Sequence, residues 1–239
     1  MIGRIVFYAA LLAIAIVTAG LQMDRQTAAS PQLAPAVPDV FRSIAQARIA
    51  ANAVGSGNSQ AALEEAEKLV MRRPVPSQSL RLLALAQYGA GDIQAGSYSI
   101  QIAAQRGWRD IAAQEAMLSL ALAAGDKPEA VLRYVALLAN DRASEEFMTQ
   151  SGQSLFGSGD EVAIETLTEI AMDTERWRGG LVRKAGQFMP PPAFAEFVEQ
   201  VAGRLDGSEC EIFKRSAKRV GRSDKAASER IEAVIQKSC

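Results

Sequence analysis

The sequence contains no histidine among its 239 residues. Histidine is the commonest general base and metal ligand near neutral pH, so its absence excludes the usual catalytic triads and most zinc sites. Aromatic residues make up only 6% of the chain, whereas the helix formers alanine, leucine and glutamine recur throughout. The sequence therefore predicts an all-α protein that carries little side-chain chemistry.

An excess of positive charge is also missing, since 26 basic and 27 acidic residues give a net charge of −1. Without an overall positive field, nucleic acid is not an expected partner. The sequence has no phosphate-binding loop, nucleophile elbow or dinucleotide fingerprint. Paired carboxylates such as Glu145 and Glu146 occur on nearly every exposed helix and do not by themselves indicate an enzyme. We therefore expect no catalytic residue, no metal and no cofactor.

A long apolar segment, Ile5 to Leu21, opens the chain and contains no charged residue. As a helix it would span about 26 Å, close to the thickness of a bilayer core. We expect residues 1–21 to enter a membrane, either as an uncleaved anchor or as a signal peptide. For cleavage, Val17 and Ala19 supply the small residues that precede a signal-peptidase site.

The charges that flank this segment predict its orientation. Arg4 lies before it, whereas Asp24 and Arg25 cancel after it. This weak positive-inside signal places the N-terminus in the cytoplasm. The expected location is thus the bacterial inner membrane, with the body in the periplasm, and the cleaved alternative is a periplasmic or secreted protein. Residues 22–39, rich in Pro, Ala, Gln and Ser, predict an extended linker to a folded body at 40–239 or, alternatively, a processing remnant.

A Gly-Asp or Gly-Asn dipeptide recurs every 34 residues, beginning at Gly57, Gly91, Gly125 and Gly159, and none lies out of register. Glycine ends a helix in the left-handed conformation, and a following Asp or Asn caps the next helix. The period therefore predicts helical hairpins stacked into a solenoid.

The chain resembles the tetratricopeptide repeat family, a 34-residue helix–turn–helix with Gly-Asp at its turn. Ala62, Gly96 and Ala130 occupy the family's small-residue position, and Pro74 occupies its closing proline position. The sequence departs from the family at Ile164, where a small residue is expected, and lacks the aromatic residues usual in the first helix. The resemblance covers roughly residues 41–176 and implies a right-handed α-solenoid of about five hairpins.

The period changes towards the C-terminus. Pro190, Pro191 and Pro192 stand where the next turn would fall and predict a helix from about Ala193, completing a fifth hairpin. Ser208 to Arg222 and Asp224 to Cys239 predict a closing helix pair joined at Gly221 to Asp224. Cys210 and Cys239 lie at ends of this pair that would meet, which favours a disulfide outside the cytoplasm over two free thiols.

The resemblance also implies a concave groove, lined by the first helix of each hairpin, that binds proteins or peptides. The residues at groove positions are Gln78, Arg81, Leu85, Tyr88, Glu115, Ser119, Leu122, Glu146, Thr149, Gln153 and Phe156. The alternative interpretation is that these polar and aromatic residues are simply exposed to solvent and bind no partner. Basic residues on the first closing helix contact either an anionic partner or solvent; these are Lys214, Arg215, Lys218, Arg219, Arg222 and Lys225.

These features together favour a membrane-tethered scaffold or adaptor that organises envelope proteins during secretion, assembly or quality control. One alternative is a permanent structural subunit of an envelope polysaccharide or secretion machine. The other is an enzyme that acts on the cell wall, which the missing catalytic motifs disfavour.

Overall fold

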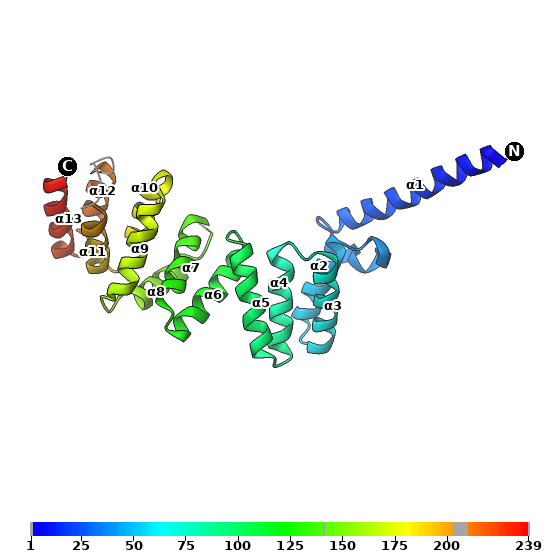
Figure 1. Ribbon diagram of the computed structural model, residues 1–239, viewed down its shortest axis with the longest axis horizontal. Helices are drawn as coiled ribbons and strands as arrows, with labels where there is room; N and C mark the ends of the chain where they lie inside the picture. Colours follow the sequence, from blue (N-terminus) through cyan, green and yellow to red (C-terminus); the bar gives the residue numbers. More distant parts are fainter. Residues whose placement is uncertain (1, 141, 203–209, 239) are drawn as a thin grey trace. The chain divides into compact units, whose positions relative to one another are not determined.

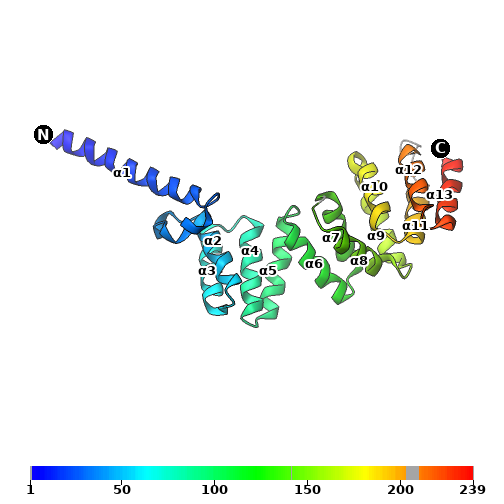
Figure 2. The same ribbon diagram turned by 180° about the vertical axis from the view of Figure 1, so that it is seen from behind.

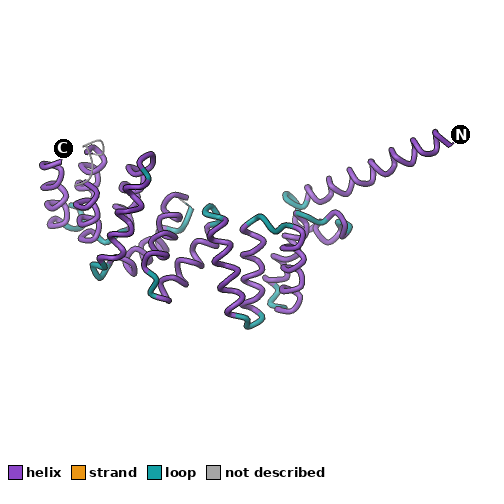
Figure 3. The backbone as a smooth tube through the Cα atoms, in the orientation of Figure 1, coloured by secondary structure: helices purple, strands orange, loops and turns teal. Residues whose placement is uncertain are grey.

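The computed structural model describes residues 2–140, 142–202 and 210–238. Within these ranges every regular element is a helix and no strand occurs, so the chain is all-α as the composition predicts (Figure 3). The chain divides into two compact units, Met1–Gly107 and Trp108–Cys239. Each unit is described by itself.

Among its described residues, 2–107, the first unit contains one long helix, two 3₁₀ turns and two helical hairpins, and Figure 1 shows the arrangement of the helices. Its elements are α1 (Ile2–Gln26), η1 (Pro31–Ala36), η2 (Asp39–Phe41), α2 (Ile44–Gly55), α3 (Ser59–Arg72), α4 (Ser77–Gly89) and α5 (Ile93–Arg106). Helices α2 and α3 pair, α4 and α5 pair, and α3 packs against α4. Alanines such as Ala50, Ala66 and Ala86 fill this core and let the helix axes approach closely.

The second unit contains eight α-helices among the residues described for it. Its elements are α6 (Ile111–Ala124), α7 (Lys127–Asn140), α8 (Glu145–Phe156), α9 (Glu161–Asp173), η3 (Glu175–Trp177), α10 (Arg178–Phe188), α11 (Pro191–Ala202), α12 (Cys210–Val220) and α13 (Lys225–Ser238). Figure 2 shows α12 and α13 side by side, and α11 packs against both α9 and α13. Large side chains such as Tyr134, Phe194 and Phe213 fill this core.

The repeat turns are built as the period predicts. The four repeat glycines are the only glycines with positive φ among the described residues, at +76° for Gly57, +85° for Gly91, +72° for Gly125 and +67° for Gly159. The Asn or Asp that follows each glycine accepts a hydrogen bond from the backbone N–H three residues later, at 3.0 or 3.1 Å. Each turn therefore ends one helix and caps the next with adjacent residues.

The hairpins in the second unit are not equally tight. Helices α6 and α7 pair closely, but α9 packs more on α7 and α11 than on α8, its neighbour in sequence. Helices α10 and α11 are joined by only Met189 and Pro190, yet each packs mainly on other helices. Helix α11 begins at Pro191, two residues before the expected Ala193, because proline is well suited to the first turn of a helix.

The expected linker is folded, which corrects the prediction for residues 22–39. Helix α1 continues past Leu21 to Gln26, and the chain then forms η1 and η2. Ala34 and Val37 are completely buried in a small cluster with Ala45 of α2. The proline and alanine content predicted an extended chain, but these small apolar side chains instead pack beneath the start of α2.

The closing helix pair forms as expected within the described residues. Helices α12 and α13 pack on each other across the turn at residues 221–224, and Asp224 accepts a hydrogen bond from the Ala227 N–H at 2.9 Å. Cys210 is the first residue of α12. Cys239 and the expected start at Ser208 lie outside the described residues, so the pairing of the two cysteines stays a prediction.

Candidate functional site

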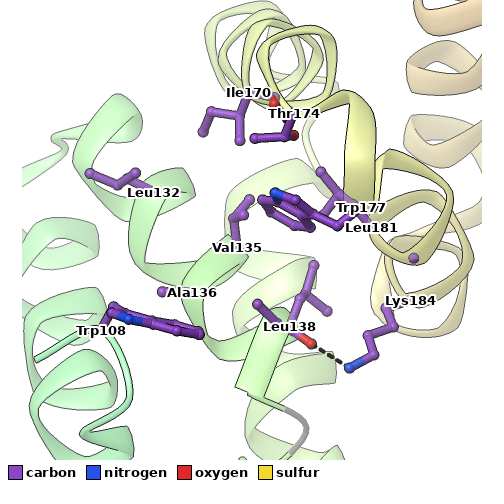
Figure 4. Close-up of a pocket in the computed structure, with 12 residues that line it drawn as sticks. Trp108, Leu132, Val135, Ala136, Leu138, Ile170, Thr174, Trp177, Leu181 and Lys184 are labelled. Atoms are coloured by element: carbon purple, nitrogen blue, oxygen red, sulfur yellow. Dashed lines mark hydrogen bonds between the residues drawn. The ribbon is translucent and has the colours of Figure 1, made fainter.

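An apolar cleft of about 640 Å³ lies in the second unit (Figure 4). Both tryptophans of the chain line it. The lining residues are Trp108, Leu132, Val135, Ala136, Leu138, Ala139, Ile170, Thr174, Trp177, Gly180, Leu181 and Lys184. We call this site the tryptophan cleft.

Trp108 lies three residues before the start of α6 and is fixed from two sides. Its backbone carbonyl accepts a hydrogen bond of 2.6 Å from the Asn140 side-chain amide, at the end of α7. The Arg109 guanidinium carbon lies 4.7 Å from the centre of the indole ring, within cation–π range. Trp108 is nevertheless 50% exposed, so its position is set while much of its apolar surface faces solvent.

Trp177 ends the short turn η3 between α9 and α10 and is fixed by the residue that follows it. Arg178 is 5% exposed, and its guanidinium donates to the carbonyl oxygens of Ala171 at 2.8 Å and Met172 at 3.1 Å. These carbonyls end α9, so the arginine satisfies acceptors that the helix leaves without partners. The same contacts hold the turn that presents Trp177.

The floor of the tryptophan cleft is the second half of α7. Figure 4 shows Val135, Ala136 and Leu138 between the two indole rings, with Leu132 at one end. Lys184 donates from Nζ to the Leu138 carbonyl oxygen at 2.8 Å, which places a positive charge at the C-terminal turn of α7. Only Thr174 and Lys184 among the lining residues carry a hydroxyl or a charge.

The composition of the lining determines what the cleft can do. It contains no carboxylate, thiol or pair of groups suited to proton transfer, so its chemistry is the burial of apolar surface. Among the described residues, no group of three Cys, Asp or Glu side chains is placed to hold a metal ion. The cleft is therefore a candidate binding site rather than a candidate active site.

The groove residues expected on α4 have different environments. Gln78 is exposed and Arg81 is half-buried. Tyr88 packs on its own hairpin: a Cβ at Gly96 of α5 would lie 2.7 Å from the tyrosine ring, and the phenol lies 3.2 Å from the Ser97 hydroxyl. Gly96, the expected small position, thus makes room for Tyr88, whose ring mainly joins α4 to α5.

The groove residues expected on α6 and α8 do not line the cleft. The Ser119 hydroxyl donates to the Glu115 carbonyl oxygen at 3.0 Å, and burial raises the pKa of the Glu115 carboxyl. Glu146 and Gln153 are exposed. Phe156 is 1% exposed and packs edge-to-face on Tyr134 in the core, so its expected groove position is wrong.

One feature of the sequence indicates the tryptophan cleft, although the groove positions were predicted without it. The only two tryptophans lie at nearly the same place in the repeat, with Trp108 17 residues after Gly91 and Trp177 18 residues after Gly159. Residues at one place in a solenoid repeat lie along one edge. This spacing therefore places both tryptophans at the connections between hairpins and not in the first helices of the repeat.

A second candidate site lies in the first unit, where α1 joins the body. A Cβ at Gly20 would overlap the Phe41 ring, so helix and ring touch at a residue without a side chain. The Asp24 carboxylate, 4% exposed, accepts hydrogen bonds from the backbone N–H groups of Ser43, Ile44 and Ala45 at 2.9, 3.0 and 2.8 Å. Asp24 thus caps α2 from a distant segment. We call this contact the α1 clamp.

Comparison with known proteins gives no family for this chain. No protein-family model matches the sequence, and no curated protein matches it significantly. The function is therefore inferred from the geometry of the chain itself, in particular from the tryptophan cleft, the apolar helix α1 and the α1 clamp.

Proposed function

We propose that this protein is a membrane-tethered helical-repeat adaptor that binds a segment of another protein in the tryptophan cleft. The observation that carries the proposal is the open, apolar cleft that contains both tryptophans of the chain. Tryptophan is enriched among the residues that contribute most to protein–protein affinity, because it buries a large area at little entropic cost.

The exposure of the cleft favours a protein over a small ligand. Trp108, Leu132 and Trp177 are 50%, 44% and 37% exposed. A pocket for a small molecule usually encloses its ligand, whereas these side chains remain open to solvent and need a larger cover. Large exposed apolar surface of this kind is typical of protein contact sites. The expected occupant is a helical or extended segment that inserts two or three apolar side chains.

The repeat supports the wider architecture that we propose, a right-handed solenoid of the tetratricopeptide type. Its support is the left-handed glycine that recurs at a fixed interval and the Asn or Asp cap that follows it. The concave groove remains a second hypothesis for protein binding, with the exposed Gln78, Glu146 and Gln153 as its candidate contacts.

Helix α1 supports the tether. It is one long apolar helix near the N-terminus, compatible with a single-pass anchor or a signal sequence. Its residues from Ile2 to Ala19 are all exposed, and 18 residues of helix span about 27 Å. We propose an uncleaved anchor in a bacterial inner membrane, with the body in the periplasm. Its support is that α1 runs without a break into the α1 clamp.

Site-specific photo-crosslinking in living cells tests the binding function. A benzophenone amino acid at Leu132, in the cleft, is compared with one at Val162 of α9, which is 51% exposed but does not line the cleft. We expect a discrete crosslinked product from position 132 that disappears when Trp177→Ala is added, and no such product from position 162. Equal products from both positions, or none from position 132, would overturn the proposal.

A further inference from the structure

A hollow of about 470 Å³ lies in the first unit, beside the α1 clamp. Its lining residues are Thr18, Leu21, Gln22, Asp24, Arg25, Ser43, Ile44 and Arg73. Four of them, Thr18, Leu21, Gln22 and Arg25, follow helical spacing and lie along one side of α1. The hollow is thus bounded on one side by α1 and on the other by the start of α2 and the residue after α3.

The hollow lies beside the part of α1 that would leave a membrane surface. Every residue of α1 from Ile2 to Ala19 is exposed, and Gly20 is the first residue of α1 buried against the body, although Leu21 and Met23 beyond it are still exposed. Because the α1 clamp leaves no flexible linker, the start of α2 lies next to the point where the apolar helix ends. With α1 anchored in a bilayer as proposed above, Thr18 and Leu21 lie at the level where acyl chains meet headgroups.

Two arginines give the hollow its charge. Within the described part of the chain, the side chains of Arg25 and Arg73 have no hydrogen-bond or ion-pair partner. Asp24 is the only acidic lining residue, and its carboxylate is buried and already accepts three backbone N–H groups. Two uncompensated guanidinium groups thus share a cavity with the apolar Leu21 and Ile44.

We propose that this hollow binds an anionic phospholipid, with its phosphate between Arg25 and Arg73 and its acyl chains along Thr18 and Leu21 of α1. Guanidinium groups suit phosphate because their planar donors match its oxygens. The apolar side chains of Leu21 and Ile44 in the hollow favour a lipid over free phosphate, which would leave both in contact with water. This inference rests on the proposed membrane anchorage of α1.

Native mass spectrometry of the full chain, released from vesicles of phosphatidylcholine and phosphatidylglycerol, tests the site. We expect one retained phosphatidylglycerol per chain and an about five-fold loss of occupancy for each of Arg25→Gln and Arg73→Gln. The matched control, Arg215→Gln with Lys218→Gln, removes two exposed positive charges from α12 and leaves occupancy unchanged.

Three outcomes would overturn the lipid site. These are equal retention of phosphatidylcholine, equal loss in the control variant, and displacement of the lipid by millimolar inorganic phosphate, which would indicate a general phosphate site. Resistance of each variant to extraction from the vesicles by alkaline carbonate is measured in parallel. Resistance without lipid selectivity refutes the site but leaves the anchorage standing, whereas extraction of the unmodified chain refutes both.

Discussion

Replacing a repeat glycine with alanine tests whether the turns depend on the left-handed backbone. The four glycines adopt φ between +67° and +85°, and no heavy atom outside their immediate neighbours lies within 4 Å of a Cβ built on any of them. The substitution therefore causes no steric clash at these positions. Any loss of stability would report on backbone conformation alone.

The expected loss follows from two opposing effects. An L-residue in the left-handed region costs about 1–2 kcal/mol relative to glycine. Alanine also reduces the conformational freedom of the unfolded chain, which returns about 0.4–1 kcal/mol. We therefore expect Gly125→Ala to lower the free energy of unfolding by about 1 kcal/mol. Gly125→Asn is the matched control and should cost less, because asparagine tolerates this conformation.

Urea unfolding of the full chain in mild detergent, followed by far-ultraviolet circular dichroism, measures these differences. Gly180→Ala is a second control, since Gly180 lies in α10 without positive φ and has no atom within 4 Å of its built Cβ. Alanine there should stabilise the protein by about 0.5–1 kcal/mol. If Gly125→Ala were neutral, or if asparagine and alanine were equally harmful, the conformational explanation would be refuted.

Three further predictions concern single contacts. Asp24→Ala should destabilise the first unit by about 2–3 kcal/mol, because three backbone N–H groups lose a charged acceptor. Hydrogen exchange at the first amides of α2, which should become faster, measures this loss. Tyr134→Phe should leave stability unchanged or raise it by up to about 1 kcal/mol in thermal unfolding, since the buried hydroxyl has no partner in the described ranges; a clear loss would contradict this. Alkylation of unreduced protein from cells should leave Cys210 and Cys239 unmodified, whereas two modified thiols would refute the disulfide.

The repeat turns could be predicted because their determinants are local. Each needs a glycine that adopts positive φ and an adjacent Asn or Asp that caps the next helix, as at Gly91 and Asp92. Both requirements are met within four residues of sequence, so no knowledge of distant contacts is needed. The cap at Asp224, between the two closing helices, is local as well, although Gly221 in that turn does not adopt positive φ.

The α1 clamp could not be predicted because its parts are far apart in sequence. Asp24 caps backbone groups about 20 residues away, and Ser43, which directly precedes α2, makes no side-chain cap bond. The segment between them contains no apolar period, and its buried residues Ala34 and Val37 pack in a small cluster with Ala45 of α2. The lack of an apolar period therefore indicated a linker, whereas contacts between residues distant in sequence fold this segment.

The tryptophan cleft shows a different limit. The groove positions came from the first helices of the repeat, and that pattern placed Phe156 on a surface although it is buried. Helix α9 packs mainly on α7 and α11, so the second unit departs from the regular pairing that the pattern assumes. The spacing of Trp108 and Trp177 did contain information, but which side chains face a common cavity depends on this packing.

Both candidate sites lie at the same kind of place within their own units. Each of the four repeat hairpins has a glycine turn at one end and a connection to its neighbour at the other. Trp108, Trp177 and Arg73 all lie in or beside these connections, and none lies at a glycine turn. The turns must keep a glycine and a capping side chain, because the hairpin depends on both. The connections also supply caps, such as Asp110 before α6 and Ser144 before α8, but they need no left-handed glycine. Their other residues can therefore differ in chemistry while the repeat stays intact.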